Sequence, residues 1–246
     1  MRTFGLIGYP LSHSFSKKHF TEKFEQEHIL DCRYELFPLE KINLLESLLD
    51  KPGLRGLNVT IPYKVQVLPY LQEMEAAAAG IGAVNCISIE SRNGERYLKG
   101  YNTDAYGFET SLRPFLKAHH QKALVFGDGG AAKAVKYVLQ KLGIEFISVV
   151  RTPAEGCFLY RDVTESLLDT HHILINTTPL GMSPNIESCP DIPYTCLTGD
   201  HLAYDLVYNP EETLFLRQAA AAGASVKNGM EMLYLQAERS WEIWNR

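Results

Sequence analysis

A glycine-rich segment, LVFGDGGAA at residues 124–132, has the residue types that a phosphate-binding turn requires. Its Gly127, Gly129 and Ala132 match the pattern G-x-G-x-x-A. The first glycine permits a tight turn, the second lets the backbone approach a pyrophosphate, and the small third residue lets helix and strand pack closely. Because an apolar strand pattern precedes the segment and a helical pattern follows it, we expect it to bind a dinucleotide. The alternative is a strand–helix turn without a ligand.

The residue at the end of the next strand should select the form of the dinucleotide. An acidic side chain there would accept hydrogen bonds from the adenosine ribose. This chain has Arg151 instead, whose guanidinium suits a 2′-phosphate through forked, charge-assisted hydrogen bonds. We therefore expect NADP in preference to NAD, the alternative being a surface arginine. Asp128, inside the glycine loop, would repel a pyrophosphate unless its carboxylate points away.

A hydroxyl-rich segment, GYPLSHSFS at residues 8–16, follows the first expected strand. Short hydroxyl side chains suit a small polyhydroxylated or carboxylated ligand. The alternative is that Ser14 or Ser16 caps the helix that follows. The residue pattern alone favours neither.

Two further residues could handle a proton. Lys64 ends the segment NVTIPYK at 58–64, just after a strand, and ligands gather outside the carboxyl ends of strands in α/β sheets. A lysine there polarises a carbonyl or transfers a proton when its surroundings tune its pKa, although by itself it would be a surface lysine. Asp104 lies in GYNTDAYGF at 100–108, where the alternative role for a side chain of this type is to cap the next helix.

Strands and helices alternate along the chain and must position these residues. The patterns predict strands at 3–8, 33–38, 56–60, 83–90, 95–99, 122–127, 144–150, 172–176 and 203–207. They predict helices at 17–30, 41–49, 73–79 with Gly80 at its end, 130–142, 211–222 and 230–244. Arg92-Asn93-Gly94 indicates a hairpin, and Pro114 should end or bend a helix near the domain junction at 103–116. The alternation predicts an α/β fold with parallel sheets covered on both faces.

Composition excludes several classes of protein. The 246 residues are 46% hydrophobic and 22% charged, which excludes a disordered chain. A net charge of −5 disfavours a nucleic-acid partner, and the longest nearly uncharged stretch, 76–89, is too short to span a membrane. The five cysteines form no CxxC pair, so we expect free thiols, a cytoplasmic protein and no zinc or other metal site.

These segments together closely resemble the shikimate dehydrogenase family. The shared motifs occur in the family's order and cover nearly the whole chain: GYPLSHSFS, NVTIPYK, GAVN (82–85), GYNTDAYGF, GDGGAA, NTTPLGM (176–182), YDLVYNP (204–210) and NGMEMLYLQA (228–237). The resemblance implies a two-domain α/β protein. Residues 1–103, completed by a C-terminal helix at 229–246, would form an N-terminal α/β substrate domain, and 104–228 a Rossmann-type, doubly wound NADP-binding domain.

The resemblance implies reduction of 3-dehydroshikimate to shikimate with NADPH, in aromatic amino acid biosynthesis. It assigns catalysis to Lys64 and Asp104, and substrate binding to Ser14, Ser16, Thr60, Asn85, Tyr208 and Gln236. It assigns the cofactor to Gly127, Asp128, Gly129, Gly130 and Ala131 at the pyrophosphate, Arg151 and Thr152 at the adenosine phosphate, and Leu206 and Gly229 at the nicotinamide.

The sequence departs from the family's pattern at two cofactor positions. Asp128 replaces a small residue of the glycine loop, and Val150 stands before Arg151 where asparagine is usual. We expect a small-molecule substrate, no nucleic-acid or membrane partner, and a monomer or homodimer. Two alternatives stay open: a quinate/shikimate dehydrogenase that uses NAD, and a non-catalytic dinucleotide-binding sensor on the same scaffold.

Overall fold

The computed structural model describes residues 1–11 and 14–246, so Ser12 and His13 of the hydroxyl-rich segment lie outside the described residues. The chain divides into two units. Met1–Thr103 and Gln236–Arg246 form one, called here the N-terminal unit, and Asp104–Leu235 forms the central unit. Both are α/β, as the alternating patterns predict.

In the described part of the N-terminal unit, six strands form one sheet in the order β2-β1-β3-β5-β6-β4. The strands are β1 (Arg2–Gly8), β2 (Cys32–Pro38), β3 (Leu54–Val59), β4 (Glu73–Met74), β5 (Cys86–Arg92) and β6 (Glu95–Tyr101). β1 is parallel to β2 and β3, whereas β5 is antiparallel to β3 and β6. The expectation of a parallel sheet is therefore wrong here. The predicted hairpin reverses the chain, with φ of 54° at Asn93 and 84° at Gly94.

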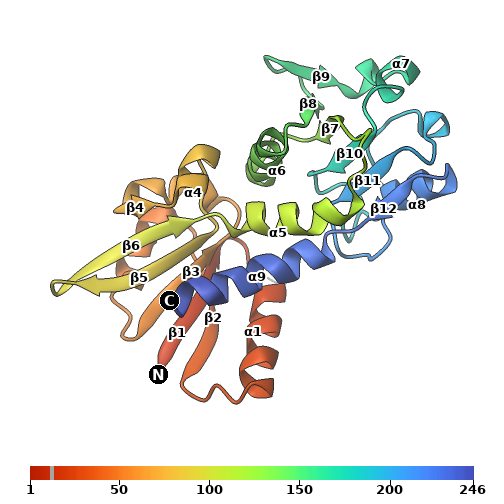
Figure 1. Ribbon diagram of the computed structural model, residues 1–246. Helices are drawn as coiled ribbons and strands as arrows, with labels where there is room; N and C mark the ends of the chain where they lie inside the picture. Colours follow the sequence, from red (N-terminus) through yellow and green to blue (C-terminus); the bar gives the residue numbers. More distant parts are fainter. Residues whose placement is uncertain (12–13) are drawn as a thin grey trace. The chain divides into compact units, whose positions relative to one another are not determined.

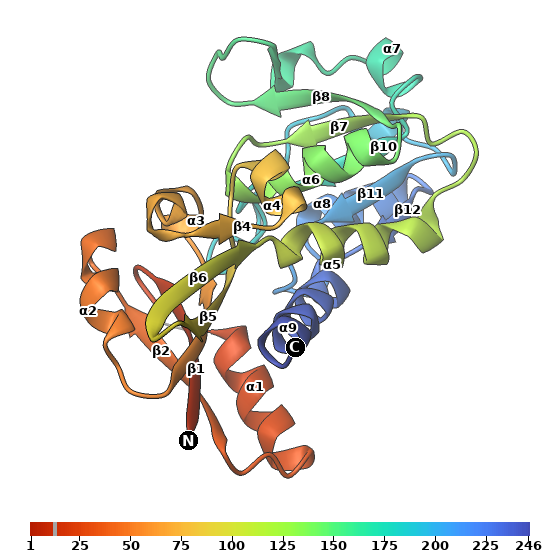
Figure 2. The same cartoon turned by 60° about the vertical axis from the view of Figure 1, so that its left-hand side comes forward.

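Helices cover both faces of this sheet, as Figure 1 and Figure 2 show together. They are α1 (Phe15–Gln26), α2 (Leu45–Leu49), α3 (Tyr63–Gln66), α4 (Ala76–Ile81) and the C-terminal part of α9 (Met230–Trp244). On one face α1 and α9 enclose an aromatic core, in which the Phe4 and Trp244 rings stack at 4.8 Å and Phe20 lies 5.5 Å from Trp244. On the other face α2 and α3 bury Leu45 and Tyr63.

Three helices of this unit differ from their predicted bounds. The helix expected at 41–49 is a 3₁₀ turn at Ile42–Leu44 followed by α2. The helix expected at 73–79 begins at Ala76, because Glu73 and Met74 pair with β6 as the short strand β4. Its C-cap is Gly82, in the left-handed region at φ 67°, and not Gly80. The helix expected at 17–30 begins at Phe15 and ends at Gln26. The single turn α3 has too few residues to give a periodic signal.

The residues of the central unit, Asp104–Leu235, are all described, and they form a six-stranded sheet in the order β12-β11-β10-β7-β8-β9. The strands are β7 (Lys122–Phe126), β8 (Glu145–Val150), β9 (Cys157–Leu159), β10 (Ile173–Asn176), β11 (Leu202–Asp205) and β12 (Ser225–Lys227). Every neighbouring pair is parallel, as predicted, and Figure 2 shows most of these strands side by side. The edge strands β9 and β12 were not predicted, because three residues are too few to show a pattern.

The helices of the central unit are α5 (Thr103–Leu112), α6 (Gly130–Lys141), α7 (Glu165–Leu168) and α8 (Leu214–Ala221). Phe126 packs against Phe215 of α8 on one face of the sheet. Tyr204 points to the other face, where its hydroxyl lies 2.7 Å from that of Ser111 on α5. Pro114 ends α5 in a 3₁₀ turn, as predicted. No helix of the described residues is long and apolar enough to cross a membrane.

Candidate functional site

Loops from four adjacent strands share one edge of the central sheet. Phe126 of β7 lies opposite Asn176 of β10 and Val149 of β8, and Asn176 lies opposite Asp205 of β11. The residues that follow these strands therefore leave the sheet side by side. The strand order reverses between β7 and β10, and α/β sheets bind ligands at the carboxyl ends of strands beside such a reversal.

The glycine loop begins at this reversal. Gly127 has φ 100°, and a Cβ on it would lie 2.8 Å from Thr177 Oγ1 and 2.9 Å from Thr178 Cγ2, so only glycine fits. Gly129 is the N-cap of α6 and brings no side-chain cap, and no described residue would come within 4 Å of a Cβ placed there. Open space in front of backbone N–H groups at a helix N-terminus fits a pyrophosphate.

The negative charge of Asp128, beside that open space, is paired with a positive charge. Its carboxylate forms an ion pair with the ammonium of Lys136, further along α6. The Lys136 side chain is only 20% exposed, whereas that of Asp128 is 51% exposed. The repulsion expected from the sequence is therefore offset by a neighbouring cation.

Arg151 and Thr152 follow β8 and are both exposed. The Arg151 charge acts on Tyr160, lowering a pKa that burial raises above its usual range. Tyr160 in turn stacks on Phe126, with ring centroids 5.9 Å apart. Arg151 follows β8 at the same sheet edge at which the glycine loop follows β7, since Val149 lies opposite Phe126.

A buried carboxylate, Asp205, fixes the turn after β11. It accepts hydrogen bonds from Asn176 Nδ2 at 2.9 Å, the Val207 N–H at 2.9 Å and Thr213 Oγ1 at 2.6 Å. Burial raises the pKa of Asp205 to about 6, and these three bonds act in the opposite direction. The turn that carries Leu206 is held on both sides, because the Gly229 N–H also donates to the Val207 carbonyl at 3.1 Å.

Gly229 is also the only residue type that fits its position against this turn. A Cβ on Gly229 would overlap the Leu206 carbonyl. Close contact of the two backbones places Leu206 and Gly229 together at the carboxyl edge of the sheet. Tyr208, two residues further on, is half-buried, and burial raises its pKa.

Segments of the N-terminal unit converge in the same manner. Ile7 of β1 lies opposite Val59 of β3, so the hydroxyl-rich segment and Thr60 leave the sheet at one edge. Cys86, the first residue of β5, lies opposite both Asn58 and Tyr101. Asn85 therefore lies at the same edge.

Lys64 stands on α3, whose backbone is fixed from two directions. Tyr63 donates its N–H to the Thr60 carbonyl at 2.9 Å, and its buried hydroxyl donates to the Leu39 carbonyl at 2.5 Å. The Lys64 carbonyl accepts the Val84 N–H at 2.8 Å. The side chain of Lys64 is half-buried. None of these anchors uses the ammonium group.

A buried polar network joins Asn85 to Gln236. Asn85 Oδ1 accepts the Thr103 N–H at 2.6 Å, and Asn85 Nδ2 donates to Thr103 Oγ1 at 3.0 Å. Thr103 Oγ1 also donates to Gln236 Oε1 at 3.5 Å. Two predicted substrate-binding residues are thereby held by the residue that directly precedes Asp104.

Both predicted serines serve the fold as well. Ser14 is the N-cap of α1, where its Oγ accepts the Lys17 N–H at 3.3 Å, so the capping role is observed. Its own O–H proton is not used by that bond. Ser16, on α1, bonds the hydroxyl of Tyr34, whose pKa burial raises well above its usual range.

The structure reveals residues to which the sequence assigned no role. Three of them lie within motifs shared with the family, which could have indicated a role: Asn176 and Thr177 in NTTPLGM, and Asp205 in YDLVYNP. No motif of the sequence pointed to Lys136, because only the fold brings its ammonium to the Asp128 carboxylate. Lys64 belongs to the N-terminal unit and Asp104 begins the central unit, and their pairing stays a prediction.

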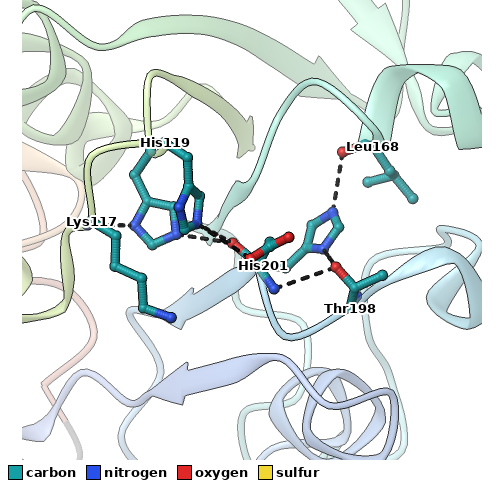
Figure 3. Close-up of polar contacts among 7 residues, drawn as sticks. Lys117, His119, Leu168, Thr198 and His201 are labelled. Atoms are coloured by element: carbon teal, nitrogen blue, oxygen red, sulfur yellow. Dashed lines mark hydrogen bonds and ion pairs between the residues drawn. The ribbon is translucent and has the colours of Figure 1, made fainter.

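Histidines gather at the opposite edge of the central sheet, where the strands begin (Figure 3). His120 Nδ1 accepts the Lys117 N–H and its Nε2 donates to the Asp200 carbonyl, both at 3.0 Å. His201 Nδ1 accepts the Thr198 N–H at 3.0 Å and its Nε2 donates to the Leu168 carbonyl at 3.1 Å. Both rings are thus satisfied as neutral imidazoles. Within residues 1–11 and 14–246, no group of three or more His, Cys, Asp and Glu side chains could hold a metal ion.

We expect the buried histidines His120, His171 and His201 to reduce the stability of the fold in mild acid. Burial lowers the pKa of His120, His171 and His201, so the folded chain resists their protonation. As the pH falls through about 6.5, the unfolded chain takes up these protons first, and the free energy of unfolding decreases. Urea unfolding from pH 7.5 to 5 measures this decrease, which Asp205 opposes below about pH 6 because its pKa is raised. His201→Gln should reduce the slope, and an unchanged slope would contradict the explanation.

The sequence of this chain is similar to those of known dehydrogenases. The family model of the shikimate dehydrogenase substrate binding domain matches residues 6–87. A shikimate dehydrogenase (NADP(+)) of Carboxydothermus hydrogenoformans is 40% identical over 261 aligned residues, which cover 98% of this chain and 90% of that protein.

Two solved structures are informative about ligands. A shikimate 5-dehydrogenase from Thermus thermophilus in complex with NADP(H) and shikimate is 31% identical, with a TM-score of 0.84, covering 99% of this chain and 93% of that one. A quinate dehydrogenase from Corynebacterium glutamicum in complex with NAD is 27% identical, with a TM-score of 0.85 and the same coverage.

Proposed function

This chain belongs to the shikimate dehydrogenase family, and we propose that it catalyses the reversible NADPH-dependent reduction of 3-dehydroshikimate to shikimate in aromatic amino acid biosynthesis. The observation that carries the proposal is the 40% identity to a shikimate dehydrogenase over nearly the full length of both chains. We assign NADP binding to the central unit, and substrate binding to the N-terminal unit together with Tyr208 of the central unit. A cytoplasmic location is supported by the five cysteines, which are all free. The active form would be a monomer or a homodimer.

The glycine loop supports the assignment of the cofactor. Gly127 and Gly129 would let the backbone approach the pyrophosphate, with Gly130 and Ala131 supplying N–H groups from the first turn of α6. Arg151 and Thr152 would bind the adenosine phosphate. Leu206 and Gly229 would contact the nicotinamide, on the turn that Asp205 holds in place.

Ketone reduction requires a hydride and a proton. When bound, NADPH supplies the hydride. We assign to Lys64 the stabilisation of the developing alkoxide and the handling of its proton, since a fixed ammonium is worth most where negative charge appears. Asp104 would accept a hydrogen bond from a neighbouring substrate hydroxyl and hold the Lys64 ammonium in place.

We assign binding of the substrate carboxylate to Ser14 and Ser16, through hydrogen bonds. Ser14 uses its oxygen to cap α1, which leaves its O–H proton to donate. Ser16 would donate beside it, turning to the carboxylate the proton that it otherwise gives to Tyr34, whose own hydroxyl donates to Asn58 Oδ1 at 2.8 Å. The remaining substrate contacts are assigned to Thr60, Asn85, Tyr208 and Gln236.

Initial rates with each pair of substrates test the proposal. Absorbance at the reduced-nicotinamide band should rise fastest with shikimate and NADP. The highest rate with quinate and NAD would favour the alternative to which the quinate dehydrogenase likeness points. No turnover with any pair, together with NADPH binding, would favour a non-catalytic sensor.

The variant Arg151→Ser should use NADP and NAD with similar KM values. Loss of charge-assisted hydrogen bonds costs about 1.5–3 kcal/mol, so the KM for NADP should rise roughly ten- to hundredfold while that for NAD changes little. Arg161→Ser removes another exposed arginine of the same unit and serves as the matched control. An equal change for both cofactors would contradict the role assigned to Arg151.

A further inference from the structure

The glycine loop contains a negative charge where an anion should bind. Asp128 lies between the two glycines whose backbone would approach the pyrophosphate, and its side chain is 51% exposed. A carboxylate within a phosphate-binding loop opposes binding, because water screens like charges only in part over distances shorter than the screening length of about 8 Å. The charge must be compensated if the loop is to bind a dinucleotide tightly.

Lys136 supplies that compensation. It lies on α6, with its ammonium paired to Asp128 Oδ1. At 20% exposure, its aliphatic stem is largely enclosed, which limits the positions that the ammonium can reach. The other lysine of α6 with an ion pair in the structure, Lys141, binds Glu109 at 2.7 Å instead.

We propose that Lys136 is a positioning residue for the dinucleotide, which acts through Asp128 by holding its carboxylate aside and neutralising it. The ammonium itself does not contact the phosphates. This inference rests on the proposed function, because it requires a dinucleotide at the glycine loop. It predicts that the effect of Lys136 on binding disappears when the side chain at position 128 carries no charge.

A double-mutant cycle tests the inference through NADPH binding, measured by fluorescence titration without substrate. The four proteins are the unchanged chain, Lys136→Met, Asp128→Asn and the double variant. Lys136→Met should weaken NADPH binding about tenfold, which is about 1.4 kcal/mol. Asp128→Asn should bind at least as tightly as the unchanged chain, and the double variant should match Asp128→Asn within about twofold.

Lys141→Met is the control for loss of one positive charge from the same helix. Lys141 ends α6, whose 12 residues span roughly 18 Å, well beyond the screening length of about 8 Å at physiological salt. Its variant should bind NADPH normally. A salt series separates repulsion from a folding defect, because the penalty in Lys136→Met should shrink as salt increases, whereas a damaged fold would not be rescued.

Three results would overturn the inference. Lys136→Met could bind NADPH as tightly as the unchanged chain. The lysine substitution could cost the same affinity in the Asp128→Asn background as in the unchanged chain, which would make Lys136 a direct phosphate ligand. Failure of the unchanged chain itself to bind NADPH would refute the proposed function, and the inference with it.

Discussion

Replacing Lys64 with methionine should lower kcat for shikimate oxidation at least a hundredfold while leaving NADPH affinity within about twofold. Removing one oriented donor to a developing oxyanion costs about 3 kcal/mol of barrier, which corresponds to roughly this factor. The fold should tolerate the change, because the anchors of α3 are the Lys64 carbonyl and the Tyr63 side chain. Steady-state rates and an NADPH titration measure the two quantities.

Lys41→Met is the matched control, since Lys41 is an exposed lysine of the same unit that is assigned no site role. It should retain full activity. A Lys64→Met variant that keeps kcat within about threefold of the unchanged chain would exclude Lys64 as the group that stabilises the alkoxide.

Replacing Asp205 with alanine should lower the free energy of unfolding by about 3–5 kcal/mol. The substitution leaves three hydrogen-bond donors, on Asn176, Val207 and Thr213, without their acceptor. Because Asp205 is fully buried, these donors lose a partner away from solvent. Urea unfolding at pH 7.5 measures the loss.

Asp205→Asn is the conservative companion. Its amide oxygen can still accept two of the three bonds, so the loss should be about 1 kcal/mol. The carboxyl pKa, raised to about 6, means that the folded chain binds this proton more tightly than the unfolded chain. The contribution of Asp205 to stability therefore falls as the pH rises from about 4 to 6, and the asparagine variant should lack this decline. An alanine variant within about 1 kcal/mol of the unchanged chain would show that water replaces the carboxylate.

Sequence patterns predicted those features that local residues determine. The glycine loop required φ 100° at Gly127, and the hairpin required positive φ at Asn93 and Gly94, which few other residue types adopt. Long runs such as the helix at Met230–Trp244 were predicted to the residue. The parallel central sheet followed from the regular alternation of strands and helices.

Features that depend on distant partners were missed. Glu73 and Met74 have no strand signal of their own and become β4 only because β6 lies beside them. The helix α4 likewise continues past Gly80 to Gly82, whose N–H donates to the Ala78 and Ala79 carbonyls. Lys136 meets Asp128 and Asp205 meets Thr213 through the folded turns of the backbone, so no short-range pattern predicts either pair.

A crystal structure of this chain with both shikimate and NADP bound tests the roles proposed for Lys64 and Asp104. We expect the Lys64 ammonium to lie about 3 Å from the hydroxyl oxygen that is oxidised, with the Asp104 carboxylate at hydrogen-bond distance from a neighbouring hydroxyl and both facing the nicotinamide. A complex in which either group lies beyond about 6 Å from the substrate, or points into solvent, would contradict it.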